Sequence, residues 1–216
     1  MLFRSPPPPP PQRPARSAGR ELKEKGLFEA ARSVFAEEGF KGATTAEIAR
    51  RAGVPKANLH YYFPTKEALY RAVTEEILTD WLAAASSFDE NDDPREAISA
   101  YIAAKMDLAR ADPLGSRIWA SEILRGAPVI KDFLETTLAE WLASREAIMR
   151  RWIAAGKIRP LEPRYFFYMI WATTQHYADF EDQMRALNGG APLSDEQFQK
   201  AKTQAIDTIL NGVMPQ

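Results

Sequence analysis

The stretch TTAEIARRAGVPKANLHYY, residues 44–62, contains the signals of two short helices joined by a tight turn. Thr44 and Glu47 have the spacing of a capping box, in which each residue caps the backbone of the other at the start of a helix. Gly53 ends this first helix, and Pro55 stands in the first turn of a second helix, where proline is tolerated. Two short helices around a glycine-containing turn have the spacing of a helix-turn-helix.

The two helices also carry the side chains that such a motif needs. Ile48, Ala49, Val54 and Leu59 are apolar residues that would hold the helices together. The second helix would then expose a small, polar N-terminal half, which suits a DNA major groove about 12 Å wide. The same spacing fits a three-helix bundle whose polar face is merely solvated, so the spacing alone leaves both interpretations open.

The charge distribution gives a second indication. Residues 1–72 carry 13 Lys/Arg and 7 Asp/Glu, whereas the remaining 144 residues carry 15 Lys/Arg and 22 Asp/Glu. A basic N-terminal part on an acidic remainder suggests that the N-terminal part meets a polyanion such as DNA. A basic disordered tail is the alternative reading, because 4 of those 13 basic residues lie in residues 1–20.

Outside the helix-turn-helix, the chain divides into a tail and a long series of helices. Residues 1–20 are rich in proline, arginine and serine, and we expect them to be disordered with a short polyproline stretch. Beyond them the apolar residues recur with helical period and nowhere alternate as in a strand. The expected helices span residues 21–38, 45–52, 55–62, 65–87, 94–111, 115–124, 129–155, 163–187 and 194–210. The sequence therefore predicts an all-α chain of about nine helices, with a three-helix head at residues 21–66 and a larger helical body at residues 67–216.

Residues 40–69 resemble the signature of the TetR family of transcriptional regulators over their whole length and in register. The resemblance implies a helix-turn-helix head that binds a palindromic operator in double-stranded DNA, and a body that binds a small ligand and forms a homodimer. Pro55 stands where serine often caps the recognition helix, and His60 stands where tyrosine is common, so the operator sequence is not implied. The resemblance places the contacts to phosphates and bases on Thr44, Thr45, Lys56, Ala57, Asn58, His60, Tyr61, Tyr62 and Lys66.

The body resembles one subgroup of that family, the regulators of pyrimidine utilisation. Four strings carry this resemblance, at residues 58–69, 77–82, 122–128 and 169–180, whereas residues 195–216 do not obviously follow it. The resemblance implies that a pyrimidine such as uracil or thymine, or a related nitrogenous heterocycle, is the effector that releases the repressor from its operator.

The expected helix at residues 163–187 carries the residues that would read such a ligand. It is apolar on nearly every face between Tyr165 and Phe180, yet it holds four polar residues in succession at positions 173–176. Buried polar side chains need partners, and a glutamine amide both donates and accepts hydrogen bonds. These polar groups could equally satisfy each other or a partner subunit across an interface. The predicted ligand contacts are Tyr168, Trp171, Thr174 and Gln175, with Trp81 placed on the opposite wall by the resemblance.

The same helix predicts how two copies of the chain associate. Phe166, Phe167, Ile170 and Tyr177 cannot all face one core while Trp171 lines a pocket. We therefore expect a dimer in which the last two long helices of each subunit form a four-helix bundle. Two-fold symmetry would then set the two recognition helices about 34–36 Å apart, to match successive major grooves.

Composition excludes several other classes of protein. The chain has no cysteine, its only histidines are His60 and His176, and it has neither a nucleophile elbow nor a glycine-rich phosphate loop, so we expect no catalysis, no cofactor and no metal site. No apolar run is long enough for a membrane span, and we expect a cytoplasmic protein. A DNA-bound scaffold whose body binds another protein, or an unrelated small molecule, remains the alternative; its mark would be an apolar surface patch without an internal cavity.

Overall fold

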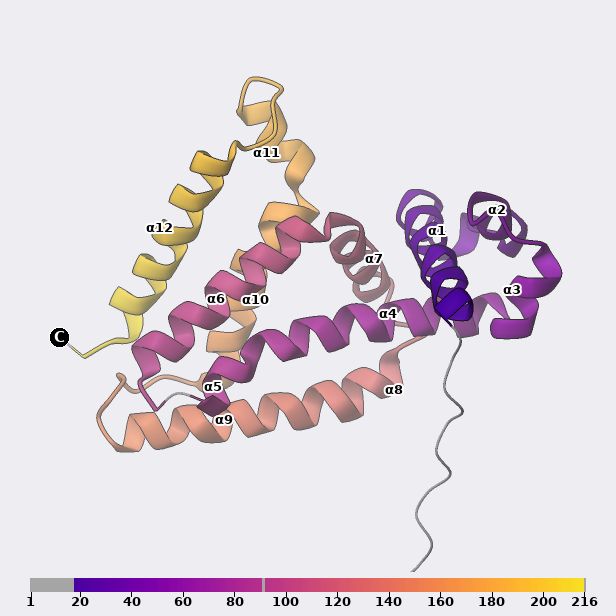
Figure 1. Cartoon of the computed structure of the whole chain (residues 1–216). Coiled ribbons are helices and arrows are strands. Elements are labelled where there is room, and N and C mark those ends of the chain that lie inside the picture. The colour runs from indigo at the N-terminus through magenta and orange to yellow at the C-terminus, as the bar shows by residue number, and fades with distance from the viewer. Residues whose placement is uncertain (1–17, 91, 216) are drawn as a thin grey trace, which may run out of the picture.

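The structure is a computed structural model that describes residues 18–90 and 92–215, and every regular element in these ranges is helical. The predicted all-α fold is thus confirmed (Figure 1). The tail predicted at residues 1–20 lies outside the described residues except for positions 18–20, which begin the first helix. The helices are α1 (Ala18–Gly42), α2 (Thr45–Arg51), α3 (Lys56–Tyr62), α4 (Lys66–Ala83), α5 (Ser87–Glu90), α6 (Pro94–Ala111), α7 (Pro113–Leu124), α8 (Lys131–Phe133), α9 (Ala139–Ala154), α10 (Pro163–Asp179), α11 (Glu181–Leu187) and α12 (Asp195–Val213).

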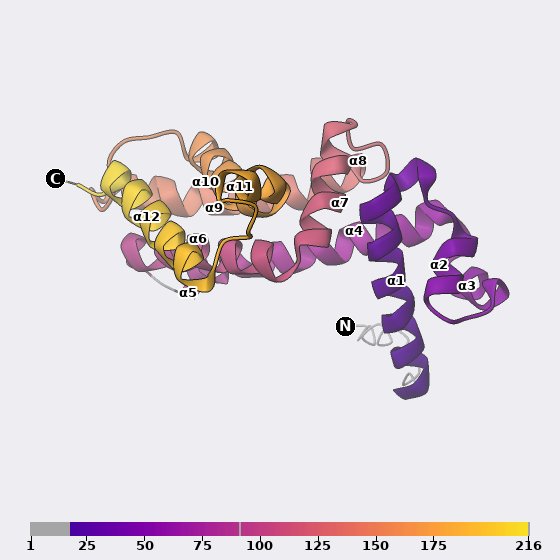
Figure 2. The same ribbon diagram turned by 90° about the horizontal axis from the view of Figure 1, so that it is seen from above.

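The first three helices form a head at one end of the molecule (Figures 1 and 2). Leu27 and Val34 of α1 share one hydrophobic core with Ile48 of α2 and Leu59 of α3. Gly39 adopts a φ of 66° within α1, a left-handed conformation that suits glycine, and so ends the regular helix before the chain turns into α2. The apolar residues predicted to join the two short helices therefore do so.

Helix α4 connects the head to the body. It has 18 residues, which corresponds to about 27 Å, and Thr65 caps its start by accepting a hydrogen bond from the backbone N–H of Ala68. Leu69 and Val73 are buried near the head, and Trp81 is buried near the far end, inside the body. One rigid element therefore contacts both parts of the molecule.

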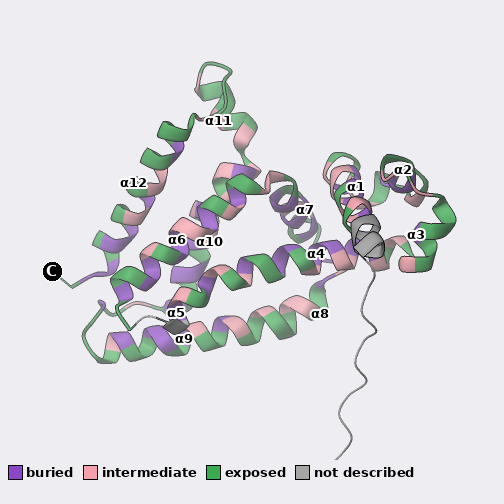
Figure 3. Ribbon diagram, viewed as in Figure 1, coloured by how far each residue is buried: buried purple, intermediate pink, exposed green. Residues whose placement is uncertain are grey.

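The body is built around α6, against which both α10 and α12 pack. Tyr101 of α6 and Phe167 of α10 meet Phe88 and Trp152 in an aromatic core. Buried residues follow the facing sides of these helices, while the outer sides of α11 and α12 are mostly exposed (Figure 3). No helix within the described ranges is long and apolar enough to cross a lipid bilayer.

Three predicted helices differ from the observed ones. The helix expected at residues 65–87 ends at Ala83 and continues through a 3₁₀ turn, Ala84–Ser86, into α5. The helix expected at residues 129–155 contains a π-helical turn, Leu134–Leu138. The helix expected at residues 163–187 is interrupted at Phe180, whose φ of −116° and ψ of 29° lie outside the helical region. No glycine or proline marks these breaks, so the described residues contain more and shorter helices than the nine expected.

Candidate DNA-binding surface and ligand pocket

Helix α3 presents a polar, exposed surface at the tip of the head. Lys56, Ala57, Asn58 and His60 are exposed while Leu59 between them is fully buried, so one side chain anchors the helix and the others face solvent. Pro55, at the N-cap position of α3, makes no side-chain cap. The first backbone N–H groups of α3 therefore receive no hydrogen bond acceptor from the N-cap side chain. This arrangement suits a helix that enters a DNA groove.

The remaining predicted DNA contacts surround α3. Thr44 precedes α2 and accepts a hydrogen bond from the backbone N–H of Glu47 at 3.1 Å, so it caps α2 as expected. The reciprocal bond from Glu47 does not form, because its carboxylate binds arginines instead. Tyr61 is 75% exposed, Tyr62 is half-buried beside it, and Thr45 is half-buried at the start of α2.

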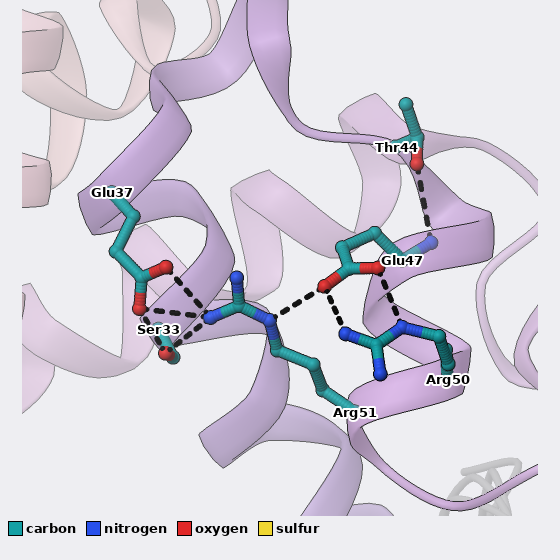
Figure 4. Close-up of polar contacts among 6 residues, drawn as sticks. All are labelled: Ser33, Glu37, Thr44, Glu47, Arg50 and Arg51. Atoms are coloured by element: carbon teal, nitrogen blue, oxygen red, sulfur yellow. Dashed lines mark hydrogen bonds and ion pairs between the residues drawn. The ribbon is translucent and has the colours of Figure 1, made fainter.

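An ion-pair cluster fixes α2 against α1 (Figure 4). The Glu47 carboxylate accepts hydrogen bonds from Arg50 at 2.7 and 2.8 Å and from Arg51 at 2.8 Å. Arg51 also donates to Glu37 of α1 at 2.8 Å and to Ser33 at 3.0 Å. The hydrogen bonds from Arg50, and next those from Arg51, lower the pKa of Glu47 to about 2. The cluster therefore holds the two helices in a fixed relation while leaving α3 free.

We predict that Glu47→Gln lowers the melting temperature at neutral pH by a small amount, because the cluster is exposed to solvent. Since the folded-state pKa lies below the ordinary value, the stabilisation is present above about pH 4.5 and is lost as the pH falls toward 2. Thermal melts of both proteins should therefore converge in acid. Glu38→Gln, at an exposed carboxylate nearby on α1, is the control, and an equal loss from it at neutral pH would contradict a specific role for Glu47.

Lys66 contacts residues of the head that the sequence did not predict as its partners. Its Nζ donates to the carbonyl oxygens of Phe40 at 2.7 Å and Ala43 at 3.0 Å, and it lies 4.5 Å from the centre of the Phe40 ring. Two of its three N–H groups are thus engaged in joining α4 to the α1–α2 connection. The phosphate contact expected from the sequence stays a prediction, and the contacts seen instead favour a role for Lys66 in holding the head together.

We therefore expect Lys66→Met and Lys56→Met to weaken DNA binding in different ways. Lys56 is exposed on α3, so its loss should lower the slope of log K against log salt by about one unit, as expected for a phosphate contact. Loss of Lys66 should loosen the head and weaken binding with little change in that slope. Binding measured at several salt concentrations separates the two cases. A one-unit change for Lys66→Met would show that its third N–H reaches a phosphate.

The body contains a cavity of about 280 Å³ that is partly open to the surface. This is close to the lower end of ordinary ligand pockets, about 300–1,000 Å³, and suits a single small ring. The cavity lies where α4, α6, α7, α9 and α10 meet, and the π-helical turn closes one wall. Its lining comprises Leu78, Trp81, Leu82, Tyr101, Lys105, Trp119, Ile123, Leu134, Leu138, Trp141, Trp171 and Gln175.

Four tryptophans and one tyrosine line the cavity, together with an equal number of aliphatic residues. The Trp171 indole donates from Nε1 to the Tyr101 hydroxyl at 2.8 Å, which holds its ring in place. The rings of Trp81 and Trp119 meet edge to face at 5.6 Å. Trp141 Nε1 is buried and has no hydrogen-bond partner among the described residues. A flat heterocycle with polar edges would therefore find both stacking surfaces and a free donor.

Lys105 brings a charge to this apolar cavity. Its side chain is 4% exposed, and its Nζ lies 4.1 Å from the centre of the Trp81 ring. Burial lowers the pKa of Lys105 to about 7, an effect that the carboxylate of Asp179 opposes. Burial raises the pKa of Asp179, and the Ser116 hydroxyl donates a hydrogen bond to it. Lysine and carboxylate thus share one corner of the body beside the cavity.

Three of the five predicted ligand residues line the cavity, namely Trp81, Trp171 and Gln175, and two do not. Tyr168 is 47% exposed on the outer side of α10, and Thr174 is fully buried with its hydroxyl bonded to the carbonyl oxygen of Ile170 at 2.8 Å. A residue three positions away on an α-helix is rotated by about 60°, so Tyr168 and Thr174 lie on either side of the Trp171 direction. The structure therefore does not place these two residues at the cavity, and their contact with a ligand stays a prediction.

Lys105, Trp119 and Trp141 line the cavity but were not predicted from the sequence. A signal for Lys105 existed, because Ile98, Tyr101 and Lys105 share one face of α6 with helical spacing, and a lysine in a buried stripe is unusual. The two tryptophans come from other helices, and no local pattern shows that they face the same cavity. Within the described ranges, no group of three or more His, Cys, Asp or Glu side chains is placed so that it could hold a metal ion.

Comparisons with known proteins agree with this architecture. Residues 27–73 match the family described as bacterial regulatory proteins, tetR family, and residues 74–216 match the C-terminal region of YcdC-like proteins. The chain is 41% identical over 201 residues to the HTH-type transcriptional regulator RutR of Escherichia coli K12, which covers 93% of this chain and 94% of that protein. It is 26% identical to the HTH-type transcriptional repressor KstR2 of Mycolicibacterium smegmatis, over 87% of this chain and 88% of that repressor.

Solved structures show the same fold. The ketosteroid transcriptional regulator KstR2 of Mycobacterium tuberculosis superposes with a TM-score of 0.72 at 22% identity, covering 94% of this chain and all of that one. A TetR family transcription regulator from Marinobacter aquaeolei gives a TM-score of 0.70 at 19% identity, covering 91% of this chain and 97% of that one. With both parts of the chain matched, this protein belongs to the TetR family of bacterial regulatory proteins and is a transcriptional regulator with an N-terminal helix-turn-helix.

Proposed function

We propose that the protein is a cytoplasmic repressor that binds a palindromic operator as a dimer and is released by a pyrimidine, for which uracil and thymine are the leading candidates. The observation that carries this proposal is the cavity, in which tryptophan rings surround the polar groups of Gln175 and Lys105. The resemblance to regulators of pyrimidine utilisation supports the same ligand class. An apolar effector such as a steroid would leave the buried ammonium group of Lys105 and the half-buried amide of Gln175 unpaired, which is unfavourable.

The proposed ligand geometry follows from the cavity wall. A pyrimidine ring would stack against Trp171, whose orientation Tyr101 fixes, with Trp81 on the opposite side. The imide edge of uracil offers an N–H donor between two carbonyl acceptors. The amide of Gln175 both donates and accepts, so it would pair with the N–H and one of these carbonyls.

Phe166, Phe167 and Ile170 are all buried in the core of one subunit while Trp171 lines the cavity, so the expectation that they need a partner subunit was wrong. A different set of apolar residues, an exposed stripe on α10, supports the dimer. Tyr165, Tyr168 and Met169 are exposed on one side of this helix, and Phe180 is exposed just beyond its end. Contiguous exposed apolar residues on a helix mark an interaction surface, and two-fold symmetry would bring the same stripe from a second subunit against it. The outer face of α12 is mostly exposed, so it is available to pair with a second subunit in the expected four-helix bundle (Figure 3).

Two helices offer a physical path from the cavity to the head. On α4, Trp81 lines the cavity and Lys66 braces the head, about 22 Å apart along the axis. On α7, Trp119 lines the cavity, and Arg125 just beyond the helix end donates to the Tyr70 hydroxyl at 3.4 Å. Because the Tyr70 ring packs against the aromatic rings of α1, a ligand that displaces either helix would move the head.

A panel of free bases tests the ligand class. Uracil and thymine should raise the melting temperature of the purified protein, because a ligand that binds only the folded state stabilises it by mass action. Adenine, which has no carbonyl groups and no imide edge for Gln175 and Lys105 to bind, is the negative control. If neither pyrimidine shifts the transition at millimolar concentration, the effector belongs to another class, or the body binds a protein instead.

A further inference from the structure

We propose that Lys105 is the specificity-determining residue of the cavity, because its ammonium group donates a hydrogen bond to a carbonyl oxygen of the ligand that Gln175 does not reach. The inference rests on the proposed function and adds a second reading point to it. A ring with a carbonyl on each side of an N–H, such as uracil, would form hydrogen bonds with both Gln175 and Lys105. Cytosine would present an amino group in place of one of these carbonyls, and an amino group accepts no hydrogen bond from Lys105.

The first support is the burial of Lys105 without a direct ion pair. Lys105 is 4% exposed, and its ammonium group interacts with the Trp81 ring and with the charge of Asp179 rather than in a direct ion pair with a described residue. The Nζ lies over the Trp81 ring at 4.1 Å, and both side chains line the cavity. A contact with a ring face leaves the N–H donors of an ammonium group available, and a buried donor without an acceptor is costly. A ligand oxygen would remove this cost.

The second support is the set of charges around Lys105. Asp179 of α10 is the carboxylate whose charge acts on it, but that carboxylate accepts a hydrogen bond from Ser116 of α7 and forms no ion pair with Lys105. The Tyr101 hydroxyl, one turn earlier on α6, accepts from Trp171. The side chains of α4 and α7 that line the cavity are uncharged. The positive charge of Lys105 is thus only partly balanced by the carboxylate of Asp179, and its side chain lines the cavity.

A measurable consequence is proton uptake on binding. In the free protein, burial lowers the pKa of Lys105 to about 7, so part of the lysine is neutral at and above neutral pH. A carbonyl oxygen that accepts a hydrogen bond from the ammonium form stabilises that form and raises its pKa. Binding then takes up a proton above about pH 7 but not below, where the lysine is already charged, so the affinity declines as the pH rises through this range.

Calorimetric titration of the full-length protein with uracil tests this consequence. Titrations at about pH 6 and about pH 8, each in two buffers of different ionisation enthalpy, give the number of protons taken up. For the wild type we expect little uptake in acid and a clear fraction of a proton at the higher pH. Lys105→Met should abolish this uptake and weaken uracil binding by about 10- to 100-fold, as loss of a hydrogen bond to a charged group does.

Two further variants serve as controls for the role of the charge on Lys105. Lys105→Gln keeps a donor without a titrating group, so it should bind uracil better than Lys105→Met and still take up no proton. Lys202→Met removes a lysine that pairs with Asp107 on the surface at 2.7 Å, and it should match the wild type in affinity and proton uptake. Replacing a buried charge by an apolar side chain is often neutral or stabilising, so we expect Lys105→Met to fold.

Binding of cytosine tests whether Lys105 distinguishes a carbonyl from an amino group. The wild type should bind cytosine more weakly than uracil, and Lys105→Met should narrow that difference. Uracil binding by the wild type without proton uptake, together with equal affinity in Lys105→Met, would overturn the role of Lys105 while leaving the pyrimidine effector standing. Absence of any pyrimidine binding by the wild type would overturn both.

Discussion

Replacement of Met169 by arginine on α10 should make the protein monomeric at micromolar concentration and lower its operator affinity at least about 100-fold. Met169 lies with Tyr165 and Tyr168 on the exposed apolar stripe of α10, where an arginine from each subunit would bring like charges together across a two-fold axis. A dimer binds two half-sites at once, so a monomer loses the gain that comes from linking the two contacts.

Sedimentation velocity and binding of labelled operator DNA measure both parts of this result. Ala143→Arg adds the same charge at an exposed position on α9, outside the expected four-helix bundle, and should leave the dimer and its DNA affinity intact. A dimer that persists in Met169→Arg would place the interface elsewhere.

Gln175→Leu should weaken uracil binding by about 100-fold without changing operator affinity in the absence of uracil. Leucine has a similar volume, so the cavity keeps its shape, but both the donor and the acceptor that would read the imide edge are lost. The side chain lies on α10 and lines the cavity, away from α3, so the free protein should bind DNA normally.

Thr174→Val is the matched control for this variant. Thr174 is the next residue towards the N-terminus, but its hydroxyl bonds to the carbonyl oxygen of Ile170 and does not line the cavity. Calorimetric titration should therefore give Thr174→Val nearly the uracil affinity of the wild type. Equal losses from both variants would point to a general effect on α10, and no loss from Gln175→Leu would remove it from the binding site.

Local signals explain why the head could be predicted from the sequence. Thr44 caps α2 and Gly53 adopts a positive φ in the turn, because both effects depend on residues close together in the chain. Helical periodicity and the turn residues between helices likewise predicted the order of the helices in the body. The break at Phe180 escaped prediction because the helix on either side has continuous helical residues and no glycine or proline.

The cavity could be predicted only in part, for a different reason. Trp171 and Gln175 are one turn apart on a single helix, so the sequence alone places them on one face. Lys105 joins them only through the packing of α6 against α10, and Trp119 and Trp141 through the positions of two further helices. Tyr168 and Thr174 show the limit of proximity in sequence. Thr174 is fully buried in the core, and Tyr168, about two turns before Gln175, is half-exposed, so neither lines the cavity.

Release of operator DNA by uracil is the property that the fold and the cavity together predict. An operator can be obtained by selecting duplexes that the purified protein binds from random DNA, and the anisotropy of the labelled duplex then follows binding. With saturating uracil, we expect the operator affinity to fall by about 5- to 150-fold, the usual range of such coupling, and operator DNA should weaken uracil binding by the same factor. Uracil that binds the protein but leaves the operator affinity unchanged would contradict a pyrimidine-released repressor.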